Sequence, residues 1–442
     1  MSAATTRPKV LVIGCGFGGL EAVRALSKAD IEITLVDRTN HHLFQPLLYQ
    51  VATAGLSAPA VSAPIRHTLR REMKRGNLTI LQAEVTAIDA AAHQVTLDGH
   101  EALAYDHLIV AAGATHSYFG HDDWARHAPG LKTLSDALAI RARVIGAFER
   151  AERCTDASQR GPWMTFVVIG AGPTGVEMAG TMSEIALHTL PMEFRRIDST
   201  HARIVLLEGS DRVLGSFVPK LSAKAREQLK KLGVEVCTGC KVSAIDADGV
   251  SYETRDGDTS TTHRLPSKTV IWAAGVAGSP LGKAIAASAG AALDRAGRVV
   301  VEPDLSLPGH PEISVIGDLA AAKSYGAGEP TPVPGVSPAA KQMGRTAAAN
   351  LMRRLRGEAT NPFRYIDYGN LATVGRKAAV VDLSVPLIGA IRFSGFFAWL
   401  FWLFAHIYFL IGFRNRLTVM IDWAWAYWTY ERNARVVAEP RV

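Results

Sequence analysis

The stretch Gly14-Cys15-Gly16-Phe17-Gly18-Gly19 follows the apolar run Lys9-Val10-Leu11-Val12-Ile13, and the same plan recurs where Gly170-Ala171-Gly172-Pro173-Thr174-Gly175 follows Phe166-Val167-Val168-Ile169. In a GxGxxG loop the glycines make a tight turn from strand to helix, let the backbone approach a pyrophosphate, and let the helix pack closely on the strand. The phosphates then lie at the positive end of the helix. Two such loops predict an α/β chain with two Rossmann-like dinucleotide-binding domains.

Each loop is followed by an acidic residue at the end of the next predicted strand. Asp37 ends the run 31–36, and Glu208 ends the run 203–207. A carboxylate at this place accepts hydrogen bonds from ribose hydroxyls and repels a 2′-phosphate. We therefore expect the second nucleotide to be NAD rather than NADP, although Arg212 is close enough in sequence to argue against this assignment.

Strands and helices alternate through most of the chain, which predicts parallel sheets with helices on both faces. The two halves also end alike, because the apolar strands 107–113 and 269–275 both close on Ala-Gly. The sequence thus indicates an internal duplication. The predicted boundaries are residues 8–118 and 285–365 for a discontinuous first nucleotide-binding domain, 119–284 for the second, and 366–442 for a C-terminal segment.

A helix is predicted after the strand that ends in Gly317-Asp318. Ser337 has the chemistry of an N-cap and Pro338 that of a first helical residue, so the helix should begin there and run to about Leu355. The positive end of this helix is suited to stabilising a developing anion.

Composition and charge narrow the class of protein. The chain has 442 residues, 48% of them hydrophobic and 20% charged, which is typical of a globular protein with two or three domains. The net charge of +7 suits an acidic partner, either nucleic acid or an anionic membrane surface. No basic run is interleaved with aromatic residues, so we expect no nucleic-acid partner. Four cysteines and no apolar targeting core indicate a reducing compartment and no signal peptide.

The C-terminal segment differs in composition from the rest. Residues 393–413 carry no charge and hold two tryptophans and seven phenylalanines. As one helix this run would reach roughly 31 Å, the thickness of a bilayer core. Residues 417–430 form a second apolar stretch, rich in Trp and Tyr, which favour the membrane interface. We predict a membrane-associating helical segment, which either spans the bilayer or lies in one leaflet; a helix in the protein core is the alternative.

The run Asn40-His41-His42-Leu43-Phe44-Gln45-Pro46-Leu47-Leu48-Tyr49-Gln50-Val51-Ala52 resembles the type II NADH dehydrogenases, the single-subunit NADH:quinone oxidoreductases. The similarity extends over nearly the whole chain, including Val374-Gly375-Arg376-Lys377 and the aromatic tail. It implies FAD at the first loop, NADH as substrate at the second, and hydride transfer from NADH to FAD. A membrane quinone, ubiquinone or menaquinone, is then reduced to quinol. Family members attach to one leaflet, so we expect a peripheral protein on the cytoplasmic face of the cell membrane, possibly a homodimer.

The resemblance also implies roles for individual residues. The FAD-binding residues are expected to be Gly14, Gly16, Gly19, Asp37, Arg38, His42, Val85, Ala112, Gly113 and Asp318. The NAD-binding residues are expected to be Gly170, Gly172, Gly175, Glu177, Glu208, Ala274 and Gly275. Catalytic roles are implied for Glu177, Lys377 and Gln342. Gln342 matches the second of two family glutamines, whereas the first falls on Pro338 or its neighbour, a departure that affects recognition of the quinone head group.

Quinone reduction consumes two protons, so proton donors must reach the ring. We hypothesise that Glu177 and Lys377 form a coupled acid/base pair whose pKa values are moved by burial and by each other. The alternative for Glu177 is an ordinary glutamate on a helix surface. Because the tail has few polar residues and no multi-helix bundle, we expect no proton pumping.

Two further readings compete with this one. The chain could be a soluble NADH-dependent flavoprotein reductase acting on ferredoxin or a disulfide, or a non-catalytic basic flavoprotein that binds a partner. Cys237-Thr238-Gly239-Cys240 invites a redox or metal role. It follows a predicted outer strand of the second domain, whereas flavoprotein disulfide reductases carry their redox cysteines soon after the first ribose acid or at the helix that faces the flavin. We therefore expect small residues in a turn and no metal site.

Overall fold

The computed structural model describes residues 7–326, 328–385, 389–432 and 434–437 and is α/β, as predicted. It forms two compact units. Unit 1 comprises Met1–His42, Ala63–Thr115 and Val276–Asp367, and unit 2 comprises Leu43–Ser62, His116–Gly275 and Tyr368–Val442. These units group residues by compactness, and the predicted division by bound nucleotide stays a prediction.

Unit 1 is built on a six-stranded sheet of order β20-β21-β9-β1-β2-β5. Its strands are β1 (Lys9–Ile13), β2 (Glu32–Asp37), β5 (Leu78–Gln82), β9 (His107–Val110), β20 (Ser306–Leu307) and β21 (His310–Val315). All neighbours pair in parallel except the edge pair β20 and β21. The pairing of β21 with β9 confirms that the strand before Gly317-Asp318 returns to the first sheet.

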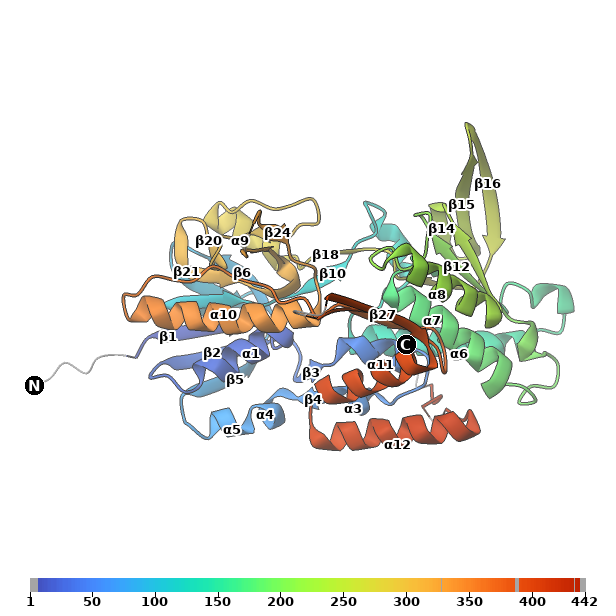
Figure 1. Ribbon diagram of the computed structural model, residues 1–442, viewed down its shortest axis with the longest axis horizontal. Helices are drawn as coiled ribbons and strands as arrows, with labels where there is room; N and C mark the ends of the chain where they lie inside the picture. The colour runs from blue at the N-terminus through green and yellow to red at the C-terminus, as the bar shows by residue number, and fades with distance from the viewer. Residues whose placement is uncertain (1–6, 327, 386–388, 433, 438–442) are drawn as a thin grey trace, which may run out of the picture. The chain divides into compact units, whose positions relative to one another are not determined.

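Two helices lie side by side along this sheet, α1 (Phe17–Leu26) and α10 (Ser337–Leu355), the blue and orange helices in Figure 1. Their close approach depends on glycine, because a Cβ at Gly344 would lie 2.2 Å from the backbone oxygen of Gly18. The predicted helix after Ser337 is therefore present, but its cap is off by one residue. Val336 occupies the N-cap in an extended conformation, and Ser337 is already the first helical residue.

Unit 1 also contains an antiparallel meander of β6 (Val85–Asp89), β7 (Gln94–Leu97) and β8 (Glu101–Ala104), against which α9 (Leu281–Ala289) packs. Short elements complete this unit: α4 (Ile65–Thr68), α5 (Arg70–Met73), β19 (Val299–Val300), η6 (Gly317–Leu319), β22 (Ala320–Ala321), β23 (Lys323–Ser324) and β24 (Thr331–Pro332). Four further short strands lie at or near the unit boundaries: β3 (His41–Leu43), β4 (Ser62–Pro64), β10 (Ala114–His116) and β18 (Val276–Gly278).

Unit 2 repeats the plan with a four-stranded parallel sheet of order β13-β12-β11-β17. The strands are β11 (Thr165–Ile169), β12 (Arg203–Glu208), β13 (Val234–Thr238) and β17 (Thr269–Trp272). Its long helices are α6 (Leu134–Arg153), α7 (Pro173–Glu184) and α8 (Pro219–Lys231), and an antiparallel sheet is formed by β14 (Lys241–Asp246), β15 (Gly249–Asp256) and β16 (Thr259–Pro266). Its shorter elements are η1 (Gln45–Leu47), α2 (Leu48–Ala52), α3 (Ala58–Val61), η2 (Asp122–Arg126), η3 (Ala157–Gln159), η4 (Ile185–Thr189) and η5 (Ser199–His201).

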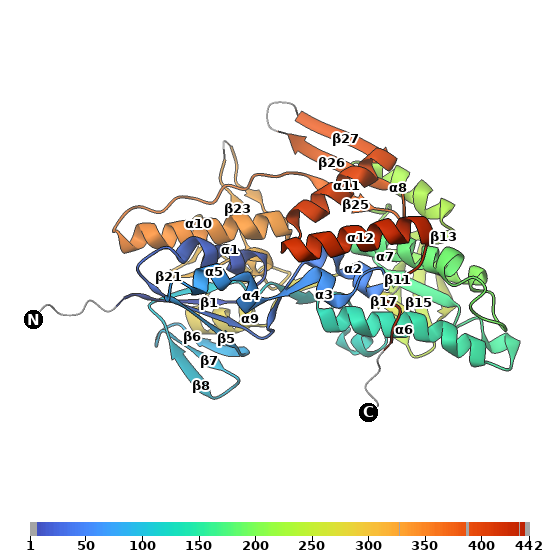
Figure 2. The same cartoon turned by 90° about the horizontal axis from the view of Figure 1, so that it is seen from below.

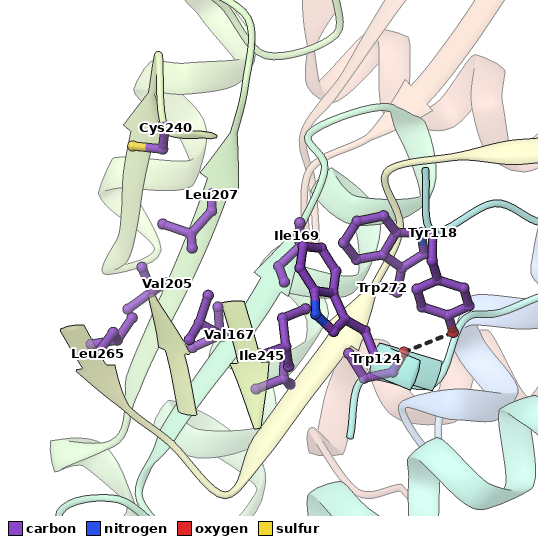
Figure 3. Close-up of a cluster of buried hydrophobic side chains, with 13 residues drawn as sticks. Tyr118, Trp124, Val167, Ile169, Val205, Leu207, Cys240, Ile245, Leu265 and Trp272 are labelled. Carbon is purple, nitrogen blue, oxygen red and sulfur yellow. Dashed lines mark hydrogen bonds between the residues drawn. The ribbon is translucent and has the colours of Figure 1, made fainter. Parts of the chain in front are cut away.

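One face of this parallel sheet is covered by a buried apolar cluster (Figure 3). Inward-facing residues of β11 and β12, including Val167 and Val205, meet Trp124 and Trp272 there. The indole N–H of Trp272 donates to the backbone oxygen of Ser117 at 2.8 Å, so the polar atom of this buried ring is paired. The cluster fixes the sheet from which the second glycine loop emerges.

The C-terminal segment belongs to unit 2 and contains a three-stranded antiparallel sheet followed by two helices (Figure 2). The elements are β25 (Asn370–Thr373), β26 (Ala379–Val385), β27 (Gly389–Gly395), α11 (Phe396–Phe409) and α12 (Phe413–Thr429). The uncharged run 393–413 is thus not one helix, because Gly395 (φ 87°) precedes α11, extended Leu410 ends α11 at Phe409, and Gly412 (φ 84°) precedes α12. Of the helices in the described part of the chain, none has both the length and the apolar character needed to cross a membrane.

Candidate active site

The two glycine loops have the same geometry. The backbone N–H of Gly14 donates to Val36 and that of Gly170 to Leu207, both at 2.7 Å. A Cβ at Gly19 would lie 1.8 Å from the oxygen of Gly14, and the sixth glycine of the second loop, Gly175, has the same 1.8 Å approach to Gly170. The helix can therefore turn back onto its strand only because the sixth residue is glycine in both loops.

The acid after each loop holds that loop by its backbone. Asp37 accepts from the N–H of Cys15 at 2.6 Å, and Glu208 accepts from the N–H of Ala171 at 2.6 Å. The other oxygen of each carboxylate accepts hydrogen bonds from the residue two positions further along the chain. Thr39 donates to Asp37, and Ser210 donates to Glu208. Arg212 donates to the backbone oxygen of Gly215 at 3.0 Å. The predicted pairing of loop and acid is therefore present twice.

The middle glycine of each loop faces open space. A Cβ built at Gly16 or Gly172 would have no atom within 4 Å, whereas one at Gly14 or Gly170 would lie 2.5 Å from a backbone atom of the strand-end turn at Ala111 or Ala274. Each loop thus leaves room at the helix N-terminus, where backbone N–H groups lack intrahelical partners. The residues present fit a dinucleotide pyrophosphate at each loop.

Parallel strands bring the other predicted nucleotide residues to the same edge. In unit 1, Asp37 ends β2, Ala112 and Gly113 follow β9, and Asp318 follows β21. In the sheet β2 and β9 flank β1, and β21 lies next to β9. In unit 2, Ala274 and Gly275 follow β17 beside β11. Val85 begins β6 in the separate meander, and Arg38 is exposed after β2.

His42 lies behind the first loop rather than on its open side. It is buried, with Nδ1 2.7 Å from the backbone oxygen of Cys15 and its ring edge-on to Phe17 at 5.3 Å. Burial lowers the pKa of His42 to about 4, so the ring is neutral at physiological pH. Cys15 is buried as well, and burial raises the pKa of its thiol above the ordinary value. These two residues therefore support the loop.

Glu177 is buried on the first turns of α7, which excludes the alternative of an ordinary surface glutamate. Its Oε1 accepts from the backbone N–H of Thr373 at 3.4 Å. Burial raises the pKa of Glu177 well above its ordinary value. Burial thus favours the protonated form of this side chain, which a proton donor requires.

The coupled pair of Glu177 and Lys377 is not formed, and this part of the hypothesis is wrong. Lys377 is exposed, in a turn with φ 64°, and its Nζ lies 5.0 Å from the centroid of the Tyr427 ring. Within the described residues no ion pair joins the two side chains, and the raised pKa of Glu177 comes from burial. The backbone N–H of Thr373, just before this turn, donates to Glu177, whereas the side chain of Lys377 is exposed.

Gln342 contacts backbone on both sides of its amide. Its Nε2 donates to the oxygen of Ile366 at 3.0 Å, and the N–H of Ile366 donates to its Oε1 at 2.9 Å. Within unit 1, this side chain thus hydrogen-bonds the segment around Ile366, which follows α10. Its predicted role at a quinone stays a prediction.

The cysteines give no support to disulfide chemistry. All four are free, and Cys237 and Cys240 lie at the end of β13, the outer strand of its sheet. Burial raises the pKa of Cys240 to about 12, so it is a poor source of thiolate.

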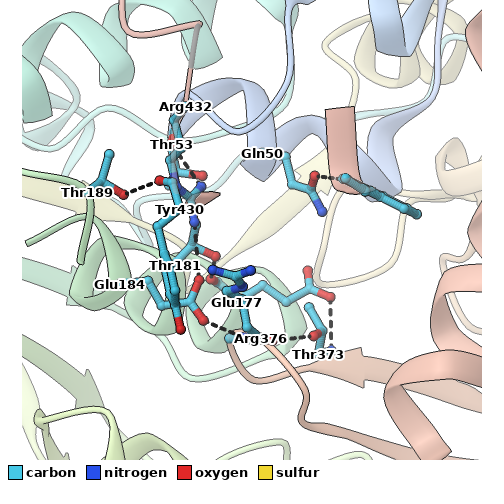
Figure 4. A network of polar contacts seen from close by, with 12 residues as sticks. Gln50, Thr53, Glu177, Thr181, Glu184, Thr189, Thr373, Arg376, Tyr430 and Arg432 are labelled. Carbon is cyan, nitrogen blue, oxygen red and sulfur yellow. Dashed lines mark hydrogen bonds and ion pairs between the residues drawn. The ribbon is translucent and has the colours of Figure 1, made fainter. Parts of the chain in front are cut away.

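Sequence reasoning missed a buried ionic network in unit 2 (Figure 4). Its members are Glu184 at the end of α7, Arg376 in the turn after β25, Arg432 in the tail, and Tyr49 in α2. The only local signal was the spacing of Glu177, Thr181 and Glu184, which places polar side chains on one stripe of an otherwise apolar helix.

Comparison with known proteins agrees with this geometry. The family model for pyridine nucleotide-disulphide oxidoreductases matches residues 8–344, and the model for the NDH2 C-terminal domain matches residues 368–429. The chain is 44% identical to the type II NADH:quinone oxidoreductase Ndh of Mycobacterium tuberculosis, over 98% of this chain and 91% of the relative. It is 45% identical to NdhA of the same organism, over 96% of this chain and 87% of the relative.

Solved structures share the fold. NDH2 from Plasmodium falciparum in complex with NADH superposes with a TM-score of 0.83 at 20% identity, covering 98% of this chain and all of the other. The sulfide:quinone oxidoreductase from Aquifex aeolicus gives 0.69 at 22% identity, covering 93% and 92%. With its two glycine loops, their acids and a matching C-terminal domain, the chain belongs to the type II NADH:quinone oxidoreductases of the pyridine nucleotide-disulphide oxidoreductase family.

Proposed function

We propose that the protein is an FAD-dependent NADH:quinone oxidoreductase that reduces a membrane quinone to quinol without pumping protons. The observation that carries this proposal is the duplicated loop, in which the acids Asp37 and Glu208 hold equivalent backbone N–H groups at 2.6 Å. One loop fits a resident flavin dinucleotide and the other a dissociable nicotinamide dinucleotide. When bound, FAD supplies the chemistry of accepting a hydride and passing on its electrons.

The residues of the first unit bind and orient the flavin dinucleotide. Gly14, Gly16 and Gly19 offer the loop backbone to the pyrophosphate, and Asp37 keeps acceptor capacity for ribose hydroxyls. Arg38, Val85, Ala112, Gly113 and Asp318 are proposed as further contacts, and His42 as a support of the loop. The N-terminus of α10, at Ser337, offers unpaired backbone N–H groups that favour negative charge.

In unit 2, Gly170, Gly172, Gly175, Ala274 and Gly275 are proposed to bind NADH. Glu208 would reject NADPH by repelling a 2′-phosphate. Glu177 is proposed to hold and deliver a proton, because its burial favours the protonated acid. Lys377 and Gln342 remain proposed participants in quinone reduction through the family resemblance.

The two C-terminal helices support a membrane surface as the place where the quinone is met. They pack on each other through Trp402 and Trp423, whose ring centroids are 5.4 Å apart, and Trp423 donates to Gln50 at 2.7 Å. Other aromatic side chains of α11 and α12 are exposed: Phe397, Phe404, Tyr408, Phe413 and Trp428. Exposed rings beside Arg392, Arg414 and Arg416 suit the headgroup region of one leaflet.

We propose that the protein attaches peripherally to the cytoplasmic face of the cell membrane, as a monomer or a homodimer. The soluble reductases are less favoured, since an enzyme that acts in solution has no use for this apolar surface. Ubiquinone and menaquinone both remain candidate substrates.

Purified protein in detergent tests the proposal. Chromatography of the released flavin should identify FAD, and anaerobic NADH should bleach the bound flavin within the turnover time. A short-chain quinone should then restore the flavin absorbance, and sealed liposomes should develop no proton gradient. A colourless protein, or a flavin that NADH does not reduce, would overturn the proposal. Salt-resistant sedimentation with anionic vesicles, lost when Phe397 and Phe404 are replaced by Ser, would support the membrane surface.

A further inference from the structure

The chain beyond α12 returns to the protein rather than leaving it. Tyr430, with φ 61°, ends the helix, and its backbone oxygen accepts from the hydroxyl of Thr189 at 3.2 Å. Its ring lies 3.8 Å from the guanidinium carbon of Arg376 and 4.9 Å from the ring of His188. The tail thus closes over the turn after β25, within unit 2 (Figure 4).

Two residues later, the tail buries a charged side chain. Arg432 forms an ion pair with Glu184 at 3.1 Å and donates to the backbone oxygen of Thr53 at 3.3 Å. The side chains of Arg432 and Glu184 are only 11% and 5% exposed. A Cβ at Gly55 would lie 3.0 Å from Nη1 of Arg432, so the notch that receives the guanidinium is narrow. Buried charges of this kind depend on each other, because either one alone would face a low-dielectric surrounding.

Glu184 also holds the turn that contains Lys377. Its Oε1, the oxygen not bonded to Arg432, accepts a short hydrogen bond from the backbone N–H of Arg376. Seven residues earlier on α7, Glu177 accepts from the backbone N–H of Thr373. The turn 373–376 is therefore attached to two glutamates of one helix, and Arg432 neutralises the second of them.

We propose that Arg432 and Glu184 are positioning residues for quinone reduction, which hold the turn 373–377 against the proton-carrying Glu177. The inference rests on the proposed function of Glu177. It assigns the tail a role besides attachment, since Arg432 follows directly on α12 and connects that helix to the turn. An exposed pair elsewhere in unit 2, Arg203 with Glu235, whose side chains are 52% and 45% exposed, provides the control.

The experiment compares Arg432→Met with Arg203→Met in the full-length, flavin-loaded protein. Reoxidation of the reduced flavin by a short-chain quinone should slow roughly 10- to 100-fold in Arg432→Met, as expected when reacting groups are displaced by about an ångström. Arg203→Met should stay within about twofold of wild type, because exposed ion pairs contribute little. Flavin content and circular dichroism establish that both variants are folded.

Three further measurements distinguish positioning from a merely structural role. Arg432→Lys, or guanidinium chloride added to Arg432→Met against potassium chloride at equal ionic strength, should restore part of the rate. Glu184→Gln in the Arg432→Met background should also restore part of it, because the unpaired buried carboxylate is removed. The pH profile of reoxidation should shift in Arg432→Met, since Glu184 then loses its cation. The groups that act on Glu184 in that profile are Arg432, Arg376, His188 and Tyr49.

The outcomes separate the two proposals. If wild-type protein fails to pass electrons from NADH to quinone, the proposed function is wrong whatever the variants do. If wild type is active and Arg432→Met loses thermal stability but keeps the wild-type rate and pH profile, Arg432 is a structural brace and the positioning role is refuted.

Discussion

The two loops make a sharp prediction about Gly172 and Gly175, which have opposite surroundings. A methyl group at position 175 would lie 1.8 Å from the backbone oxygen of Gly170, so α7 must move away from β11. Overpacking of this kind costs about 1–3 kcal/mol. For a unit of this size, each kcal/mol lowers Tm by about 2–4 °C, so Gly175→Ala should unfold about 2–12 °C below wild type.

Gly172→Ala should behave differently, because its methyl group would meet no protein atom within 4 Å and its φ of −68° suits alanine. The cost to stability should stay below about 1 kcal/mol, the scale of an N-cap substitution. The methyl group would instead occupy the space in which the pyrophosphate approaches the helix. The KM for NADH should therefore rise at least tenfold in a protein that keeps its flavin.

Thermal unfolding by circular dichroism and NADH titration of flavin bleaching measure the two effects independently. Gly16→Ala and Gly19→Ala are the matched pair in the first loop, where the expected loss is flavin content. The reasoning fails if Gly172→Ala lowers Tm as much as Gly175→Ala does, or if it leaves the KM for NADH unchanged.

Three other predictions concern Glu208, Glu177 and the pair Cys237 and Cys240. Glu208→Gln keeps an oxygen for the N–H of Ala171 but removes the charge, so turnover with NADPH should rise relative to NADH; equal preference in wild type and variant would remove Glu208 from cofactor selection. Burial raises the pKa of Glu177, so the unfolded chain loses this proton first and wild type loses stability as pH rises above the ordinary value of 4.5. Glu177→Gln should therefore raise Tm at pH 8 and leave it nearly unchanged at pH 4.5, while slowing quinone reduction; a lower Tm at pH 8 would contradict this. Replacing Cys237 and Cys240 together with Ser should leave NADH:quinone turnover unchanged, and a loss of more than about fivefold would reopen a redox role.

The features that could be predicted from sequence are local ones. A glycine loop, the strand before it and the acid at the end of the next strand are set by short-range sterics and hydrogen bonds, so Asp37 and Glu208 could be placed from spacing. The ion pair of Glu184 and Arg432 joins residues 248 positions apart, and no periodicity in the chain connects them. The expected pair of Glu177 and Lys377 failed for the same reason, because the turn around Lys377 decides which way each side chain faces.

The backbone conformation of a few residues explains why the uncharged run in the tail is not one long helix. Composition alone made residues 393–413 a candidate for one long helix, since none of them is charged. Gly395 adopts positive φ just before α11, extended Leu410 ends that helix at Phe409, and Gly412 adopts positive φ just before α12. Hydropathy reports where a segment prefers to lie, whereas its length as a helix depends on the backbone conformation of a few residues.

The duplication places a glutamate at the same position of both loop helices, in different surroundings. Glu21 and Glu177 occupy equivalent positions, two residues after the last glycine of their loops. Glu21 pairs with Arg345 of α10 at 2.7 Å and with Arg24 at 3.3 Å, so its charge is compensated. For Glu177 the described residues provide no cation within 4.0 Å, only the N–H of Thr373, and burial raises its pKa. The same motif therefore gives a glutamate paired with arginines in one copy and a buried glutamate with a raised pKa in the other, and the difference comes from what packs against the loop helix rather than from the loop.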